Sequence, residues 1–347
     1  MPFLTPSGRN LLLFEFHKLR SLRGHMQRRE FISLVGGATL AWSLGARAQE
    51  PGRVYRLALV LPVGRDEPAS LAFLDELRTQ GFVEGKNLVI VGGLPTSNEQ
   101  AAAVVPLILQ ASPDAITTGG DFIARAFQKA TKSIPLIVMT EDMVAAGFAA
   151  SLAQPGGNIT GISLMSSDLD GMRQDILLEA VPSAGRIAAL ADSHVASLEY
   201  LKVMEESARN RGKELLVVRA ASANDLLPAI NDANNRGAAA LNVLSSPMLH
   251  LNRRVIIARA AEVGLPAIYQ WPETAEEGGL LGYGPSFIDV FRQRAGMVAK
   301  VLRGAKPDDL PIEQPTKFKL VINLKTAKAI NYAVPTGLML RADKMIE

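Results

Sequence analysis

The chain has 347 residues, of which 48% are apolar and 20% are charged, and its 37 Lys and Arg residues exceed its 34 Asp and Glu residues by three. This length and this apolar content are sufficient for two domains of about 150 residues, each with its own core. Because the sequence contains no cysteine, it excludes a disulfide framework, thiol catalysis and a lipid-anchored cysteine.

The first predicted element is a cleavable export signal. Arg28-Arg29 precedes sixteen uncharged, mostly apolar residues, and Ala46-Arg47-Ala48 provides a small-x-small cleavage site. The apolar run contains three glycines and is shorter than the roughly 20 residues that span a bilayer. We therefore expect residues 26–48 to be a signal peptide that is cleaved after Ala48. The paired arginines favour the twin-arginine route, with the general secretory route left open, and residues 1–25 are interpreted as an over-extended gene start.

Removal of this segment reverses the sign of the net charge. Residues 1–48 contain seven of the Lys and Arg residues and two of the Asp and Glu residues, so 30 basic and 32 acidic residues remain, with a net charge of −2. The basic excess therefore belongs to the leader, and the remaining chain carries no electrostatic footprint for nucleic acid.

The first half of the remaining chain alternates short apolar strands with amphipathic helices. Strands are predicted at residues 54–62, 87–91, 114–118 and 135–140, and helices at residues 69–82, 98–110 and 122–132. Such alternation predicts parallel βαβ units with helices on both faces of a sheet. The continuous apolar character of the strands agrees, because parallel strands are buried on both sides.

The alternation pauses at residues 154–164 (QPGGNITGISL), which hold a short strand, and then restarts. Helices are predicted at 169–181, 197–212, 224–237 and 253–264, and strands at 186–192, 214–220, 238–244 and 266–270. A second break at 276–286 (EEGGLLGYGPS) precedes a helix at 287–304, and a last strand and a short helix follow a proline-marked segment. If each break passes between lobes, the chain crosses three times; the second break is also compatible with an ordinary strand and a tight turn.

These patterns predict an α/β fold in which two Rossmann-like parallel-sheet lobes are joined by a three-strand hinge. Lobe 1 is predicted to comprise residues 54–162 and 282–306. Lobe 2 is predicted to comprise residues 163–281 and 307–347.

The common motifs of catalysis and cofactor binding are missing from the sequence. A single glycine follows the first strand where a dinucleotide site needs G-x-G-x-x-G, and no G-x-S-x-G elbow occurs. The segment GGNITG lacks the Lys-Ser/Thr continuation of a phosphate loop. After the leader only His194 and His250 remain, too few for a metal site. We therefore expect no cofactor, no metal and no enzymatic activity.

The candidate ligand-binding residues follow the strands, because ligands of parallel sheets bind outside the carboxyl ends of the strands. They are Pro62, Thr118, Gly119, Gly120, Asp121, Thr140, Glu141, Asp142, Asp192, Ser245, Ser246, Tyr269, Gln270 and Tyr283. Backbone N–H groups and hydroxyls at 118–120 suit a carboxylate at a helix N-terminus. Glu141 or Asp142 suits an ammonium group, and Tyr269 and Tyr283, with Trp271, suit an apolar part of the ligand.

Each of these assignments has a structural alternative that the sequence leaves open. Gly119-Gly120 would simply turn the chain, with Asp121 capping the next helix, and Asp142 would cap the segment that follows it. The two serines before Pro247 also form a plain turn signature. The aromatic residues would equally pack the hinge.

Three stretches of sequence resemble one known family. They are the leader RREFISLVGG…ARAQ, the middle GFAASLAQPGGNITGIS and the end FRQRAGMVAKVLRGAKPDDLPIEQPTKFKLVINLKTAKAINYAVP. They resemble exported ABC-transporter substrate-binding proteins related to the tryptophan/tyrosine-type binding proteins of bacteria, over residues 26–347. The resemblance implies a type I periplasmic-binding-protein fold, with ABC permease and ATPase subunits in the inner membrane as partners. The sequence departs from the family pattern at 119–122 and 140–143, so the resemblance does not identify the ligand.

The residues and the resemblance together lead us to expect a monomeric periplasmic protein that captures a small organic solute. An amino acid or another carboxylate would be bound by closure of a cleft and delivered to a membrane permease. Two alternatives are a ligand-binding sensory module for a membrane receptor and a periplasmic enzyme that uses the same cleft.

Overall fold

The computed structural model describes residues 52–347. The predicted signal peptide, its cleavage after Ala48 and the over-extended start lie outside the described residues. Within residues 52–347, no helix combines the length and the apolar character needed to cross a membrane.

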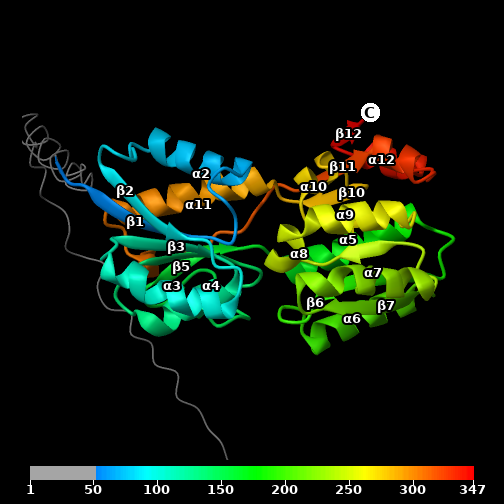
Figure 1. Ribbon diagram of the computed structural model, residues 1–347, viewed down its shortest axis with the longest axis horizontal. Helices are drawn as coiled ribbons and strands as arrows, with labels where there is room; N and C mark the ends of the chain where they lie inside the picture. The colour runs from blue at the N-terminus through cyan, green and yellow to red at the C-terminus, as the bar shows by residue number, and fades with distance from the viewer. Residues whose placement is uncertain (1–51) are drawn as a thin grey trace, which may run out of the picture. The chain divides into compact units, whose positions relative to one another are not determined.

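The first sheet has five parallel strands in the order β2-β1-β3-β4-β5 (Figure 1). They are β1 (Tyr55–Val60), β2 (Leu88–Gly93), β3 (Ala115–Gly119), β4 (Leu136–Thr140) and β5 (Ile159–Ser163). Helices α2 (Pro68–Thr79) and α11 (Phe287–Leu302) cover one face, and α3 (Asn98–Gln110) and α4 (Asp121–Ala130) cover the other. Because helices pack on both faces, β3, β4 and β5 are buried at every residue.

The second sheet has seven strands in the order β12-β11-β10-β9-β8-β6-β7, and all its pairs are parallel except β10 with β11. They are β6 (Arg186–Asp192), β7 (Glu214–Ala220), β8 (Leu241–Val243), β9 (Ala267–Tyr269), β10 (Leu281–Gly284), β11 (Lys319–Asn323) and β12 (Lys344–Ile346). One face packs against α5 (Ser166–Ala180), α6 (Leu198–Asn210), α12 (Leu324–Ala329) and α13 (Thr336–Arg341). The other packs against α7 (Leu226–Asn235), α8 (Pro247–Leu251) and α9 (Arg253–Glu262). The predicted α/β fold with two parallel-dominated sheets is therefore confirmed.

Several elements differ from the prediction in length. Helix α5 begins at Ser166 rather than at 169, and the predicted helix at 224–237 is divided into the 3-10 helix η2 (Ala223–Asp225) and α7. The short elements α8, α10 (Pro272–Glu276), α13 and β12 were not predicted. Elements of three to six residues contain too few turns or alternations to show a period.

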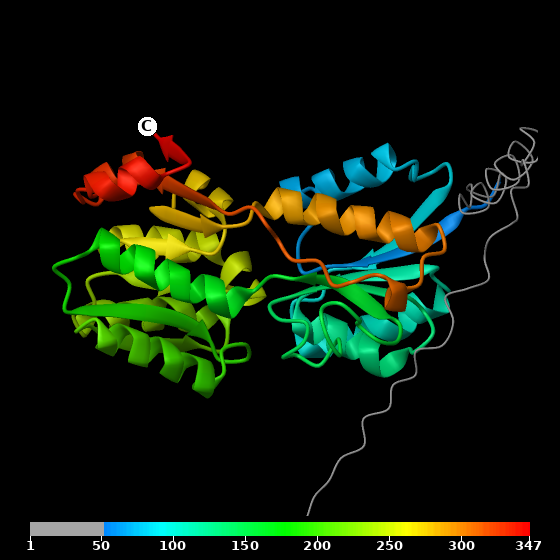
Figure 2. The ribbon, with the colours of Figure 1, turned by 180° about the vertical axis from the view of Figure 1, so that it is seen from behind.

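The chain passes between the two sheets three times (Figure 2). The first passage lies between β5 and α5, where Met165 adopts a left-handed conformation with φ of 55°. The second lies between β10 and α11. The third precedes β11, after the 3-10 helix η3 (Pro307–Asp309). Helix α11 therefore belongs to the first sheet although it follows most of the second sheet in sequence.

The contacts move two of the predicted lobe boundaries. Strand β10 pairs with β9 and β11, so residues 282–284 belong with the second sheet and not with lobe 1. Its glycines allow close packing, because an ideal Cβ on Gly284 would lie 2.2 Å from the carbonyl oxygen of Gln270. Residues 310–313 stay with the first sheet, because the N–H of Glu313 donates to the oxygen of Gly161 at 2.9 Å. We therefore propose that residues 282–284 belong to lobe 2 and residues 310–313 to lobe 1.

Candidate ligand-binding site

Both sheets reverse their strand order near the middle, and this arrangement defines where a ligand is expected. The reversal lies between β1 and β3 in the first sheet and between β6 and β8 in the second. Ligands of doubly wound sheets bind outside the carboxyl ends of the strands at this point. The carboxyl ends of these four strands and the loops that follow them carry Pro62, Gly119-Gly120, Asp192 and Ser245-Ser246.

A cavity of about 40 Å³ lies among these loops and is lined from both sheets. Its ten apolar side chains are Leu61, Pro62, Val63, Met139, Leu164, Pro247, Leu251, Trp271, Phe287 and Phe291. The other lining residues are Gly119, Gly120, Glu141, Ser246, His250 and Gln270. Of the fourteen predicted site residues, the structure thus brings six to the cavity: Pro62, Gly119, Gly120, Glu141, Ser246 and Gln270. A mostly apolar lining with few polar groups is typical of small-molecule sites.

Aromatic rings form one wall of the cavity. The ring centroids of Trp271 and Phe287 are 4.6 Å apart, and Phe287 lies 4.6 Å from Phe291 and 4.7 Å from His250. Burial lowers the pKa of His250 to about 3, so its imidazole is neutral at physiological pH. This wall offers a stacking surface for a flat ligand.

The Gly119-Gly120 turn, which we predicted to bind an anion, lines the cavity, but one of its backbone donors has a partner within the protein. Gly120 has φ of 88°, and its N–H donates to the oxygen of Met139 at 2.9 Å, so this donor is already occupied. The alternative role of Asp121 is wrong, because Gly120 is the N-cap of α4 and Asp121 is its first residue. Burial raises the pKa of Asp121 to about 6, and its carboxyl faces a neighbouring hollow together with Asp192.

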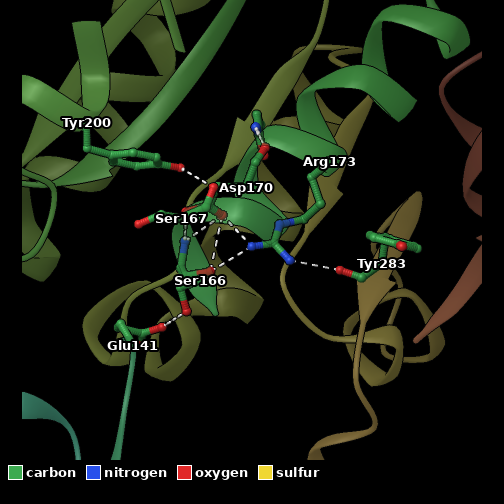
Figure 3. A network of polar contacts seen from close by, with 9 residues as sticks. Glu141, Ser166, Ser167, Asp170, Arg173, Tyr200 and Tyr283 are labelled. Carbon is green, nitrogen blue, oxygen red and sulfur yellow. Dashed lines mark hydrogen bonds and ion pairs between the residues drawn. The ribbon is translucent and has the colours of Figure 1, made fainter. Parts of the chain in front are cut away.

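Glu141 is the acidic residue that lines the cavity. It follows β4, and its carboxyl accepts a hydrogen bond from the Ser166 hydroxyl at the start of α5 (Figure 3). Protein surrounds the carboxyl, and this burial raises its pKa to about 8, against the lowering effect of the Ser166 hydrogen bond. Asp142 instead caps the turn that follows it, because its Oδ1 accepts from the N–H groups of Val144 and Ala145, both at 3.0 Å. The structural alternative thus holds for Asp142.

The serines and the aspartate of the second sheet mainly serve local structure. The Ser246 hydroxyl lines the cavity, donates to Asp192 at 2.5 Å and caps α8 by accepting from the N–H of Met248 at 3.0 Å. The Ser245 hydroxyl is buried between Arg173 and Asp170. Asp192 also accepts from the N–H of His194 at 2.9 Å.

The remaining predicted residues lie away from the cavity. Tyr269 is buried in the core of the second sheet beside Gly279, whose ideal Cβ would lie 2.7 Å from the tyrosine ring. The Tyr283 hydroxyl donates to the sulfur of Met172 at 3.8 Å, and its ring lies 6.5 Å from that of Phe318. Thr118 and Thr140 have buried hydroxyls for which residues 52–347 provide no hydrogen-bond partner. The aromatic wall is therefore formed by Trp271 and two phenylalanines, not by the two tyrosines.

A buried polar network, which the sequence did not predict, supports the first passage between the sheets. Arg173 and Asp170 form an ion pair within α5, and Arg173 donates to the Ser245 hydroxyl at 2.7 Å and to the oxygen of Tyr283 at 2.9 Å (Figure 3). Asp170 also accepts from the N–H of Ser245 at 3.1 Å. These bonds tie α5 to the ends of β8 and β10, next to Glu141.

The sequence analysis also missed the residues of α11 and His250, and only the residues of α11 could have been recognised from the sequence. Phe291 and Arg294 are buried on α11, and Phe287, one turn earlier, is half-buried. A charged residue at a helical spacing of three from Phe291 could therefore have been recognised in the sequence. His250 gave no such signal, because α8 is only five residues long.

The fold and the cavity define a two-sheet solute-binding protein, and comparison with known families agrees. Residues 66–346 match the family model of ABC transporter substrate binding proteins, and the chain belongs to this family. The resemblance noted in the sequence is therefore confirmed. Members of the family bind ligands rather than catalyse reactions, and they typically act in the periplasm or outside the cell.

Individual relatives place the chain within this family. It is 25% identical over 279 residues to the tyrosine-binding protein of Clostridioides difficile, covering 76% of this chain and 77% of that protein. A conserved domain protein from Vibrio cholerae has a similar structure, with a TM-score of 0.78, 22% identity and coverage of 84% of this chain and 100% of that chain. The structure of the ABC domain in complex with L-Trp from Streptococcus pneumonia is also similar, with a TM-score of 0.76 and 19% identity. The match covers 84% of this chain and 100% of that chain. At these identities the solved structures show the shared fold.

Proposed function

We propose that this protein captures an aromatic amino acid in the cavity described above and delivers it to an ABC permease. The observation that carries the proposal is the lining of the cavity: an aromatic wall of Trp271, Phe287 and Phe291, with the carboxyl of Glu141 at its edge. Such a wall suits an aromatic side chain, and the carboxyl suits an ammonium group. The tyrosine-binding and L-Trp-bound relatives support the same class of solute.

Capture requires two conformations of the protein. The cavity of about 40 Å³ is far smaller than the 300–1,000 Å³ that is typical of small-molecule sites. An aromatic amino acid therefore enters a more open form and is enclosed when the two sheets approach. The ligand binds the closed form better, and its differential affinity shifts the population towards that form.

The export signal completes the proposal. Residues 26–48 would direct the chain through the twin-arginine route to the periplasm, where the mature monomer would begin at Gln49 and meet the permease and its ATPase. The solute would leave unchanged, because the protein acts as a receptor and not as an enzyme.

A fluorescence titration tests this function directly. Trp271 is the sole tryptophan of residues 49–347, and it lines the cavity, so its emission should change when L-tyrosine or L-phenylalanine binds. A ligand at 100 times its Kd should also add about 2.7 kcal/mol to the free energy of unfolding. Trp271→Phe, which keeps an aromatic ring, should lose the signal but keep the thermal shift.

Three results would contradict the proposal or select an alternative. Absence of a thermal shift with every aromatic amino acid would refute the solute class. Turnover of the bound compound would establish an enzyme. Ligand-dependent binding to a membrane kinase, without transport, would establish the sensory role.

A further inference from the structure

Within the proposed function, we infer that Arg294 determines the specificity for the anionic end of the solute. Arg294 lies on α11, packed against the first sheet, and its side chain is fully buried, with 0% of its surface exposed. The inference rests on the proposed capture of an amino acid in the cavity. It assigns to this arginine the carboxylate that we first assigned to the Gly119-Gly120 turn.

The guanidinium of Arg294 has almost none of its donors satisfied. Its Nη1 donates to the oxygen of Thr118 at 3.5 Å, which is a long hydrogen bond, while Nε and Nη2 have no partner among residues 52–347. Within the same residues no carboxylate forms an ion pair with it. Burial lowers its pKa to about 9, so the side chain still carries its charge at neutral pH.

Among residues 52–347, the other fully buried arginine shows how unusual this is. Arg173 is also 0% exposed, but it has an ion pair with Asp170 and hydrogen bonds to Ser245 and Tyr283. A buried arginine is nearly always paired in this way, because an unpaired charge is costly to remove from water. Besides the long hydrogen bond to Thr118, the guanidinium of Arg294 contacts the faces of two rings, with its carbon 4.1 Å from the centroid of Phe291 and 5.2 Å from that of Phe73. Arg173 leaves only Nε without a partner, whereas Arg294 leaves both Nε and Nη2 and has no carboxylate beside it among residues 52–347.

The guanidinium of Arg294 does not line the cavity itself but lies directly behind Gly119, which does. An ideal Cβ on Gly119 would lie 3.6 Å from Nη1 of Arg294, 3.4 Å from Leu61 and 3.6 Å from Met139. Gly119, Leu61, Met139 and Phe291 all line the cavity. Because residue 119 is a glycine, no side chain at this position separates the guanidinium from the cavity. A ligand carboxylate in the cavity beside Gly119 would therefore be attracted to the cation in an environment of low dielectric constant.

Arg294 and Glu141 would then give the cavity two opposite poles. Glu141 follows β4 and Arg294 lies against the end of β3, so the two groups belong to neighbouring strand ends. The carboxyl of Glu141, whose pKa is about 8, would become the negative pole when an ammonium group binds and displaces its proton. A zwitterion with an aromatic side chain matches both poles and the wall between them. An aromatic amine, which has no carboxylate, would leave Arg294 unpaired and should bind more weakly.

The experiment compares ligands that differ only in the anionic group. Binding of L-tryptophan, L-tryptophanamide and tryptamine is measured by calorimetry for the chain from Gln49 and for Arg294→Met, Arg294→Lys and Arg292→Met. The native chain should bind L-tryptophan at least about tenfold more tightly than the amide, a difference of about 1.4 kcal/mol. In Arg294→Met this preference should disappear while the affinity for the amide is kept, and Arg294→Lys should retain part of it.

Arg292→Met is the matched control, because Arg292 is an exposed residue of the same helix and pairs only with Asp289. It should keep the native preference. The ligand-free Arg294→Met protein should unfold at a temperature no lower than the native one, because an uncompensated buried charge has been removed.

Several outcomes would overturn the inference. One is a native chain that binds the acid, the amide and the amine with equal affinity. This result would contradict the role of Arg294 even if the Arg294 variants did not fold, but it would leave the proposed capture of aromatic solutes intact. Another is an Arg294→Met variant that weakens all three ligands equally, which would indicate a purely structural role. A native chain that binds none of the three would instead refute the proposed function as well.

Discussion

At the scale of single residues, the cavity depends on charged groups held in an apolar environment. The carboxyl of Glu141 has a raised pKa because protein surrounds it, and its one direct partner in the site is the Ser166 hydroxyl. Arg294 has a lowered pKa for the same physical reason. Perturbed titratable groups at a cleft are typical of functional sites, whereas the buried Arg173–Asp170 ion pair is typical of structural support.

The pKa of Glu141 leads to a prediction about pH. The folded protein holds a proton on this carboxyl up to about pH 8, whereas the unfolded chain loses it near the ordinary value of 4.5. The folded state thus binds more protons between these values, so the stability contributed by this group falls as pH rises through the window. Glu141→Gln should flatten that fall, as measured by chemical denaturation between pH 5 and pH 9.

The same residue should couple solute binding to proton release. An ammonium group favours the ionised carboxylate, so binding at pH 7 should release a proton from Glu141. As the pH is raised towards 8, the affinity should therefore increase, by up to about tenfold per pH unit. Calorimetry in two buffers with different ionisation enthalpies measures the released proton. Proton release that persists in Glu141→Gln would assign it to another group.

The buried ion pair of α5 leads to a prediction about stability. Arg173→Met leaves Asp170 charged and buried, which should lower the free energy of unfolding by about 3–5 kcal/mol. The exposed pair between Asp175, on the same helix, and Arg211 is the control, and Arg211→Met should cost about 1 kcal/mol or less. Equal costs in urea denaturation would show that burial of the Arg173 pair has no energetic consequence.

At the scale of elements, glycines determine how closely neighbouring strands and passages approach. Gly161 in β5 has φ of 153°, and an ideal Cβ there would lie 1.8 Å from the oxygen of Val138 in β4. Strand β5, which leads into the first passage, therefore packs closely against β4 at this residue. Other glycines of the chain, including Gly171 in α5, have open space around them.

A matched pair of glycine variants tests this distinction. Gly161→Ala should destabilise the protein by at least about 2 kcal/mol, because backbone atoms have to move to admit the methyl group. Gly171→Ala should stabilise it by about 0.5–1 kcal/mol, since alanine is preferred inside a helix. Thermal unfolding of both variants measures the difference, and a tolerated alanine at 161 would contradict the close packing of β4 and β5.

At the scale of the whole described chain, three passages connect the two sheets, and a narrow cavity lies where the strand ends meet. Because the cavity is too small for the aromatic amino acid that we propose as the solute, we expect binding to be coupled to the relative position of the sheets. The passages near Met165 and Gly284 are short, which allows bending but restricts twisting. Ligand would therefore act on the population of closed molecules.

Solution scattering tests this coupling. The chain from Gln49 should show a larger radius of gyration without ligand than with saturating L-tryptophan, because the open form is populated when the cavity is empty. A sugar that does not shift the melting temperature is the control. An unchanged radius of gyration, together with confirmed binding, would show that the solute enters without closure of the sheets.

The sequence alone determined the fold class and the edge of the sheets at which the site lies. Alternating strand and helix periods require parallel units, and parallel units place their loops at one edge, so Pro62, Gly119, Glu141 and Ser246 could be predicted as neighbours. Only the tertiary structure decided which of those side chains face the cavity. Phe287 and Phe291 line the cavity because a late helix returns to the first sheet, and the same helix places Arg294 beside Gly119. The Ser245 hydroxyl accepts from Arg173 instead of facing the cavity. Burial and pairing depend on partners that are distant in sequence, 72 residues for Arg173 with Ser245 and 176 for Arg294 with Thr118, which local periodicity does not encode.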